Sequence, residues 1–95
     1  GRKLKKSSGM YKIEIAPSAL RYLERLKKSS ASIAIRIKDA IDELSTEPFK
    51  GKKLMGGLSH LRSLRVGDYR ILYTVINQEI LIQIIKIGHR RDIYQ

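Results

Sequence analysis

The residues of this sequence that are best suited to chemistry lie in its last third, where polar side chains interrupt apolar, strand-like segments. Arg65 and Arg70 fall within one such segment. The next segment carries four more candidates: His89, Arg90, Arg91 and Tyr94. Burying an unpaired guanidinium group is costly, so we expect these arginines to line a surface that receives an anion. We therefore predict that this surface binds RNA.

These residue types match the demands of RNA cleavage without a metal ion. The ribose 2′-hydroxyl attacks the adjacent phosphorus, so the site needs a proton acceptor, cations around the phosphorane and a proton donor for the departing 5′-oxygen. His89 is a candidate for the acceptor or the donor. Arg70 and Arg90 are candidates for holding the phosphate with planar, always-charged groups. Tyr94 offers a hydroxyl near the reacting oxygen or a ring on which a base stacks.

The charge of the chain favours the same kind of partner. A formal charge of +11 on 95 residues favours association with polyanions over small substrates. Residues 1–9 contribute four of the positive charges, and they are predicted to be the remnant of an expression vector or a disordered basic arm. Without them the charge is still +7, and residues 10–95 are expected to form a single domain.

Several classes of protein are disfavoured by what the sequence lacks. The chain has no cysteine, which removes disulfides, thiolate chemistry and cysteine-based zinc sites, as is typical of a small cytoplasmic protein. Its apolar runs are far too short to span a membrane of about 30 Å. The carboxylates do not cluster with the spacing of metal ligands, so we expect neither a metal nor a cofactor.

Hydrophobic periodicity predicts the first elements that position these side chains. Residues 11–15 alternate between apolar and charged types, which predicts a half-buried strand. A helix is expected to begin at Pro17, with Leu20 in its apolar stripe. A second helix is expected to follow Ser30 and to continue until Pro48 stops it.

The second half of the chain predicts a sheet. Residues 49–59 are rich in glycine and lysine and are predicted to form a mobile basic loop rather than an element. Strand-like segments follow at 60–66, 69–76 and 79–87, separated by two-residue connections that are typical of tight hairpins. The predicted order is β-α-α-β-β-β. We therefore expect an α+β fold with a helical hairpin on one face of a small, mainly antiparallel sheet, whose other face is open.

Alternation along the strands assigns the arginines to faces. If Leu64 faces the helices, Arg65 faces away from them and Arg62 lies on the helix side. A tight connection brings Arg65 and Arg70 to the same end of the sheet, where they can converge on one phosphate. The tail that begins at His89 is expected to leave the last strand beside them.

Two segments together resemble the RelE/ParE toxin superfamily, and in particular the RelE-type mRNA interferases. The resemblance rests on the block from Leu64 to Tyr73 followed by the run from Gly88 to Tyr94, and the RelE-like element order begins at Met10. It implies the toxin of a type II toxin–antitoxin system, a cytoplasmic protein that enters the ribosomal A site and cleaves the translated mRNA. It also implies a cognate antitoxin that wraps and neutralises the toxin.

The resemblance assigns roles to individual positions. Arg70 matches the family's arginine that contacts the scissile phosphate, and Arg90 matches the arginine that follows the fourth strand. Tyr94 matches the tyrosine near the C-terminus, and His89 falls where relatives carry lysine or histidine. Contacts with RNA or the ribosome are further expected from five basic residues: Lys52, Lys53, Arg62, Arg65 and Arg91.

One position departs from the family pattern. Ser63 stands where well-studied members have lysine or arginine, so a basic residue proposed as the proton acceptor is missing. Either His89 or the pair Lys52 and Lys53 would have to compensate. Two other functions stay open, and the departure at Ser63 is the best evidence for the second of them. One is a ParE-like inhibitor of DNA gyrase, a branch that typically lacks this catalytic set, and the other is a catalytically weak toxin homologue that binds RNA.

Overall fold

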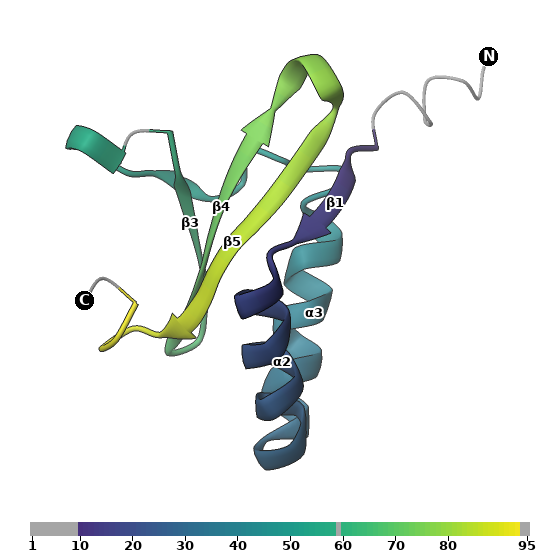
Figure 1. The fold of residues 1–95 in the computed structure, drawn as a ribbon, viewed down its shortest axis with the longest axis vertical. Coiled ribbons are helices and arrows are strands. Elements are labelled where there is room, and N and C mark those ends of the chain that lie inside the picture. Colours follow the sequence, from purple (N-terminus) through teal and green to yellow (C-terminus); the bar gives the residue numbers. More distant parts are fainter. Residues whose placement is uncertain (1–9, 59, 94–95) are drawn as a thin grey trace.

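The computed structural model describes residues 10–58 and 60–93, and its architecture is the predicted α+β fold. Five strands form one sheet in the order β1-β5-β4-β3-β2, and two helices cover one of its faces (Figure 1). The strands are β1 (Lys12–Ile15), β2 (Lys52–Lys53), β3 (Arg62–Val66), β4 (Tyr69–Ile76) and β5 (Leu81–His89). The helices are α2 (Pro17–Ser29) and α3 (Ala31–Glu43), and two short 3-10 turns are η1 (Gly56–Leu58) and η2 (Asn77–Glu79).

The sheet is mixed, because its first and last strands run in the same direction. β1 is parallel to β5, whereas the pairings of β5 with β4, β4 with β3 and β3 with β2 are antiparallel. The β3–β4 hairpin is as tight as predicted, since Gly67 adopts a φ of +60° that glycine tolerates without strain. This turn fixes the register of β3 against β4, and that register places two arginines opposite each other.

Each helix buries one apolar stripe against the sheet. Pro17 occupies the first turn of α2, where its missing N–H costs nothing, and Ala19 and Leu23 lie on the buried face. In α3 the buried face includes Ile37. Leu20 was predicted to share the buried stripe of α2, but it is 42 % exposed, because the helix contacts the sheet through the line of Ala19 and Leu23.

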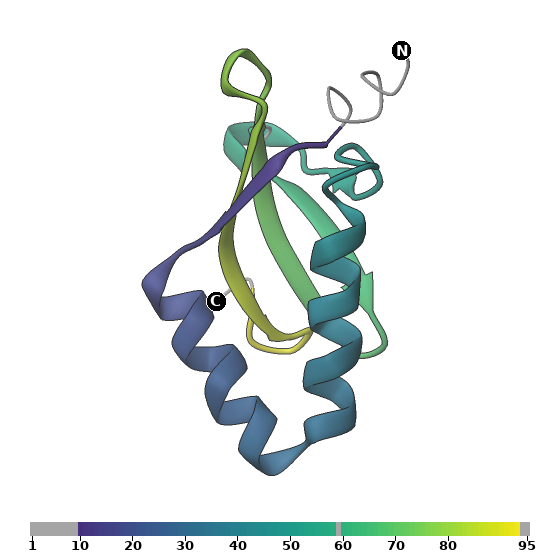
Figure 2. The same ribbon diagram turned by 90° about the vertical axis from the view of Figure 1, so that its right-hand side faces the viewer.

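The core lies between the helices and the sheet face beneath them (Figure 2). We call this face the inner face and the opposite one the outer face. The largest fully buried side chains are Tyr73, Ile37, Leu44, Ile71, Ile82 and Ile84. Leu72 and Ile93 are also buried but are not members of this core cluster. Leu72 lies on the outer face, since it alternates with the core residues Ile71 and Tyr73.

Two predicted boundaries are wrong for local reasons. Residues 49–59 do not form a featureless loop, because Lys52 and Lys53 pair with β3 as a short edge strand and η1 follows. The second helix ends at Glu43, before Pro48 is reached. The hydroxyls of Ser45 and Thr46 donate to carbonyl oxygens three residues earlier, which competes with continuation of the helix.

A buried hydroxyl holds the segment between α3 and β2 against the sheet. Tyr73 is fully buried, and its hydroxyl donates to the carbonyl oxygen of Pro48 at 2.9 Å. The same oxygen accepts the N–H of Gly51 at 2.8 Å. Burial raises the pKa of this phenol, so the group stays neutral and keeps its proton for the Pro48 contact. A side chain at Gly51 has no room, since a Cβ there would lie 2.7 Å from the Tyr73 hydroxyl.

The β4–β5 connection is longer than the predicted two residues and contains a strained one. After η2, Ile80 adopts φ 50° and ψ 51°, the left-handed region that a β-branched residue rarely occupies. Its side chain is 44 % exposed, whereas its carbonyl oxygen accepts the N–H of Lys12. The position therefore serves the backbone pairing of β1 with β5 rather than the packing of the isoleucine side chain.

Replacing Ile80 with asparagine is expected to stabilise the fold by about 0.5 to 1 kcal/mol, because asparagine tolerates the left-handed region better and little burial is lost. The midpoint of denaturant unfolding measures this effect. Ile85→Asn is the matched control, since Ile85 is similarly exposed but lies in β5, where asparagine is unfavourable. A lower midpoint for Ile80→Asn would contradict the assignment of strain.

Candidate functional site

Two guanidinium groups lie directly opposite each other on the outer face. The pairing of β3 with β4 puts Arg65 across from Arg70, and residues opposite each other in a ladder point to the same side. The neighbouring residues Leu64 and Ile71 are in the core, so alternation places both arginines on the outer face. Arg65 is exposed and Arg70 is half-buried. The structure thus brings together the two arginines that the sequence placed at one end of the sheet.

This pairing of like charges gives the fold no evident benefit. Like charges opposite each other in a sheet are destabilising by a few tenths to about 1 kcal/mol. In the part of the chain that the structure describes, the ion pairs join Lys38 to Asp42, Lys50 to Glu43 and Arg90 to Asp68, so none neutralises Arg65 or Arg70. Two neighbouring guanidinium groups without a carboxylate partner are well suited to bind a phosphate.

The last described residues return to the outer face beside Arg70. Gly88 lies across from Arg70 on the β5 side, so a side chain at Gly88 would point to the same face. Ile93 fills that space, since a Cβ built on Gly88 would lie 3.2 Å from its Cδ1 atom. The N–H of Ile93 donates to the carbonyl oxygen of His89, which closes the turn that reverses the chain. The described part of the tail, up to Ile93, is thereby anchored next to the two arginines.

His89 does not join that surface, contrary to the expectation that the tail would carry it beside Arg70. It pairs with Tyr69, a residue that packs against the core, and therefore lies on the inner face. The two rings meet edge to face with their centroids 5.3 Å apart. Tyr22 of α2 also lies beside His89. The pKa of its phenol is raised, and burial is the largest cause, whereas a hydrogen bond with the His89 backbone acts to lower this pKa.

The Nδ1 atom of His89 has a structural task in this arrangement. It accepts the backbone N–H of Arg91 at 3.2 Å, which orders the first residues of the tail. The reason for the wrong prediction is the length of β5, which continues to His89 instead of ending near residue 87. Alternation within these two further residues puts Gly88 on the outer face and the His89 imidazole on the inner face.

Arg90 continues the pairing beyond β5 and lies at the end of the sheet. Its N–H donates to the Asp68 carbonyl oxygen at 2.7 Å. Its Nε atom lies 3.7 Å from Oδ1 of the Asp68 carboxylate, and both side chains are largely exposed. An exposed pair of this kind contributes at most about 1 kcal/mol, so a phosphate can displace it. Arg91 is exposed as well. Tyr94, the remaining candidate, lies outside the described residues.

The basic residues around β2 divide between the two faces. Lys52 pairs with Ser63, and Lys53 pairs with Arg62. Ser63 lies one residue before the core residue Leu64, so Lys52 belongs to the outer face and Lys53 to the inner side. Both lysines were considered as replacements for the basic residue that Ser63 lacks. Only Lys52 lies opposite Ser63 and on the same face of the sheet.

Arg62 was expected to contact RNA or the ribosome, but its guanidinium group binds the segment of the chain that precedes β2. Its Nη1 atom donates to the carbonyl oxygens of Gly51 at 2.7 Å and Phe49 at 3.3 Å. The guanidinium carbon lies 4.9 Å from the centre of the Phe49 ring. These contacts hold the segment together on the inner side, away from Arg65 and Arg70.

Lys86 is a cationic residue of the outer face that the sequence reasoning missed. Strict alternation from the core residues Ile82 and Ile84 would turn Lys86 toward the helices. The ladder between β4 and β5 shifts register at Leu72 and Tyr73, so Lys86 pairs with Leu72 on the outer face and Ile87 enters the core. The only sequence signal for this shift is the three-residue spacing of Ile84 and Ile87.

The outer face therefore carries one cation on each of four strands, from β2 to β5, at two neighbouring register positions: Lys52 and Lys86 at one, Arg65 and Arg70 at the other. Within residues 10–58 and 60–93, no group of three histidine, aspartate or glutamate side chains could hold a metal ion. None of the helices in the described part of the chain is long and apolar enough to cross a membrane.

Two helices on one face of a small mixed sheet, with cations on the other face, define a class of small basic α+β proteins. The family model of the ParE toxin of type II toxin–antitoxin systems (parDE) matches residues 13–94. The chain belongs to the RelE/ParE superfamily of type II toxin–antitoxin toxins.

Individual relatives agree with this assignment. The chain is 33 % identical to toxin RelG of Mycobacterium tuberculosis over 86 residues, which cover 90 % of this chain and 97 % of that protein. Among solved structures, the toxin–antitoxin complex RelBE2 of the same organism contains a similar chain with a TM-score of 0.76 and 29 % identity. That match covers 87 % of this chain and 94 % of the other. The RelE–RelB complex of Pyrococcus horikoshii gives a TM-score of 0.69 at 27 % identity, with 87 % and 98 % of the two chains covered.

Proposed function

We propose that this toxin is a ribosome-dependent endoribonuclease that cleaves mRNA in the A site by metal-independent attack of the ribose 2′-hydroxyl. The observation that carries the proposal is the pair Arg65 and Arg70, two cations held opposite each other on an open sheet face without a carboxylate partner among the described residues. Such a pair lowers the stability of the free protein, and a phosphate that binds between the two groups offsets their repulsion.

The proposed reaction needs cations where negative charge develops. The 2′-hydroxyl gives its proton to a base as its oxygen forms a bond to phosphorus, and the bond from phosphorus to the 5′-oxygen breaks as that oxygen takes up a proton, so the products are a 2′,3′-cyclic phosphate and a 5′-hydroxyl. Arg70 holds the scissile phosphate with Arg65 beside it. Arg90 exchanges its exposed contact with Asp68 for the phosphate. Tyr94 then acts near the leaving oxygen or stacks on a base.

The geometry changes the roles that we assign to His89 and Lys52. His89 lies on the inner face, so we assign it the positioning of the tail through its contact with the N–H of Arg91. Lys52 lies on the outer face in register with Ser63, so it supplies the basic group that Ser63 lacks. Lys53 and Arg91 remain candidates for contacts with the ribosome at the margin of the site.

The partners of this activity follow from the family. The solved relatives from M. tuberculosis and P. horikoshii are toxin–antitoxin complexes, which supports a cognate antitoxin for this chain as well. The mRNA and the translating ribosome are the proposed targets, and they place the toxin in the cytoplasm. The charge of +11 favours rapid association with such polyanions.

A second candidate function is the inhibition of DNA gyrase, which is favoured by the ParE name of the matching family model. Adding the purified toxin to a translating extract, with primer extension on the mRNA, separates the two functions. Breaks in the A-site codon would support the nuclease. Gyrase-linked DNA breaks without mRNA breaks would support the alternative, and the absence of both would leave a toxin homologue that binds RNA without cleaving it.

The two lysines of β2 provide a matched pair of variants. Lys52→Ala is expected to lower the rate of mRNA cleavage by about tenfold to a hundredfold, because it removes a cation from the phosphate site. Lys53→Ala removes the same charge from the same strand but from the other side, and is expected to change the rate by less than about threefold. Single-turnover cleavage on programmed ribosomes measures both, and equal losses would refute the assignment of faces.

A further inference from the structure

Phe49 lies in the segment between α3 and β2, and its side chain is 50 % exposed although the backbone around it is fixed. The Tyr73 hydroxyl donates to the carbonyl oxygen of Pro48 and accepts the N–H of Gly51, so it holds the chain on both sides of Phe49. Arg62 donates to the carbonyl oxygens of Phe49 and Gly51. An aromatic ring that is presented in this way loses little conformational freedom when a ligand binds to it.

One face of the Phe49 ring is covered and the other is open. The guanidinium carbon of Arg62 lies 4.9 Å from the centre of the ring, which is within the range of a cation–π contact. Half of the residue is exposed even so, and the face opposite Arg62 is therefore open to solvent. The segment does not need the ring for its own structure, because the oxygens that Arg62 binds belong to the backbone and any residue at position 49 would supply them.

The other aromatic side chains of the described residues pack in or against the core, and all of them are tyrosines: Tyr11, Tyr22, Tyr69 and Tyr73. Phe49 is the single phenylalanine of a chain that has no tryptophan, and it is not a member of this cluster. Leaving the most apolar aromatic side chain at the surface exposes hydrophobic area to water, and a ligand that covers the ring removes that area from water. The exposed ring is therefore suited to binding.

We propose that the open face of the Phe49 ring stacks on an unpaired base of single-stranded RNA. The inference rests on the proposed function, which supplies RNA as the partner, but it concerns a second contact, away from the cations of the outer face. Bases of any identity stack on an aromatic side chain, and an unpaired nucleotide leaves a face of its base free for this contact. Both the mRNA and the RNA of the ribosome offer such bases.

The charge around the ring favours RNA over an apolar peptide. Residues 47–53 contain three lysines and one glutamate. Lys53 is exposed and lies opposite Arg62 in the ladder of β2 and β3, so both belong to the inner side. Lys50 contacts Glu43 at 2.5 Å, but both side chains are substantially exposed, so a phosphate can displace the carboxylate. A nucleotide thus supplies a flat base for the ring and a phosphate for the neighbouring cations.

The binding of two RNA probes by the purified toxin tests this contact. One probe is a single-stranded mRNA oligonucleotide that carries 2′-O-methyl groups and cannot be cleaved, and the other is the ribosome without mRNA. Phe49→Ala is expected to weaken the binding of at least one probe by about tenfold or more, because a base loses its stacking partner. The probe that is affected identifies the source of the base.

Two further variants separate stacking from general apolar contact. Phe49→Trp keeps a flat aromatic ring and should bind both probes at least as tightly as the unmodified toxin. Phe49→Leu keeps an apolar side chain without the ring, and its binding should be weakened as in Phe49→Ala. These variants also keep a large side chain over Arg62, so their comparison decides the question if Phe49→Ala proves to be unfolded by circular dichroism.

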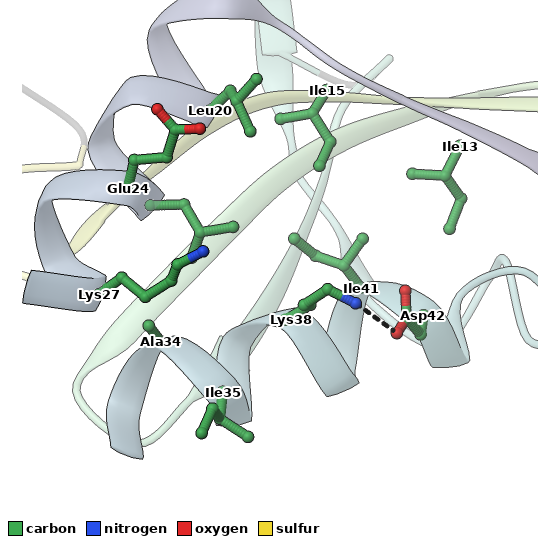
Figure 3. Close-up of a pocket in the computed structure, with 11 residues that line it drawn as sticks. Ile13, Ile15, Leu20, Glu24, Lys27, Ala34, Ile35, Lys38, Ile41 and Asp42 are labelled. Atoms are coloured by element: carbon green, nitrogen blue, oxygen red, sulfur yellow. Dashed lines mark hydrogen bonds and ion pairs between the residues drawn. The ribbon is translucent and has the colours of Figure 1, made fainter. Parts of the chain in front are cut away.

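Ile35→Ala is the matched control. Ile35 is 58 % exposed and lies in the groove between β1 and the two helices (Figure 3), which no residue of the segment 47–53 lines. Removing this exposed apolar side chain should change the affinity for either probe by less than about twofold. An equal loss in Ile35→Ala and Phe49→Ala would show that the effect is not specific to the ring.

The outcomes distinguish this inference from the proposed function. Unchanged binding of both probes by Phe49→Ala, or full binding by Phe49→Leu, would overturn the stacking contact and leave the nuclease proposal standing. Weaker binding of the co-expressed antitoxin with unchanged binding of RNA would overturn the choice of partner. A toxin that binds RNA through Phe49 but cleaves no mRNA would refute the nuclease proposal and support the contact.

Discussion

Replacing Arg70 with alanine is expected to lower the rate of mRNA cleavage by about 10² to 10³-fold and to abolish toxicity, because one well-placed cation at a developing charge contributes roughly that much. The stability of the variant should be unchanged or slightly higher. Arg70 faces Arg65 across the ladder, so its removal relieves a repulsion rather than breaking a pair. Single-turnover cleavage on programmed ribosomes and thermal unfolding measure the two effects.

A matched control distinguishes the loss of Arg70 from the loss of one positive charge elsewhere on the protein. Arg21→Ala removes one positive charge from the exposed side of α2, far from the outer face, and should leave cleavage within about threefold of the original rate. Growth arrest by the Arg70→Ala toxin at the level of the unmodified toxin would remove Arg70 from the active site. A loss of activity accompanied by unfolding would refute the expectation that this arginine is dispensable for the fold.

The second large effect concerns the fold. Tyr73→Phe is expected to lower the free energy of unfolding by about 2 to 3 kcal/mol, because the buried N–H of Gly51 and the carbonyl of Pro48 both lose their partner and each unsatisfied group costs roughly 1 to 3 kcal/mol. Urea unfolding followed by circular dichroism measures the change. The ring itself is retained, so the loss reports the hydroxyl.

Tyr11→Phe is the control for this measurement. The Tyr11 hydroxyl also makes a short hydrogen bond, at 2.7 Å to Oδ1 of Asn77, but it does so at the exposed end of the β4–β5 hairpin. Water replaces that contact, so the expected loss is below about 1 kcal/mol. Equal effects of the two substitutions would show that the buried hydroxyl does not hold the segment from Pro48 to Gly51.

The sequence predicts most of the fold because its periodicities agree with the local geometry. Pro17 occupies the first turn of its helix, as predicted, and Gly67 permits the tight hairpin that sets the register of Arg65 and Arg70. The errors occur where a strand is longer than predicted or where its register shifts, because either change alters which face of the sheet a side chain occupies. β5 is longer than its apolar pattern indicates, which moves His89 to the inner face, and a register shift in β5 brings Lys86 to the outer face.

Other features of the site depend on long-range pairing that no local pattern reports. Lys52 and Lys53 look equivalent in the sequence, and their faces are decided by which residue of β3 each one opposes. The same applies to Arg62, whose partners at Phe49 and Gly51 are more than ten residues away in the chain. Periodicity assigns side chains to faces within a strand, whereas the choice between the faces needs the register of the whole sheet.

The parallel pairing of β1 with β5 has a consequence for the synthesis of the toxin. Glu14 and Gln83 are neighbours in the sheet although they are 69 positions apart in the chain, so the sheet closes only after its final strand has been made. Closing so long a loop is slow, and the cations of β3 and β4 gain their neighbour β5 at the last step. A nascent chain that has not yet completed β5 therefore lacks the strand that lies beside Arg70, and the proposed active surface is finished only when the last strand of the sheet has been made.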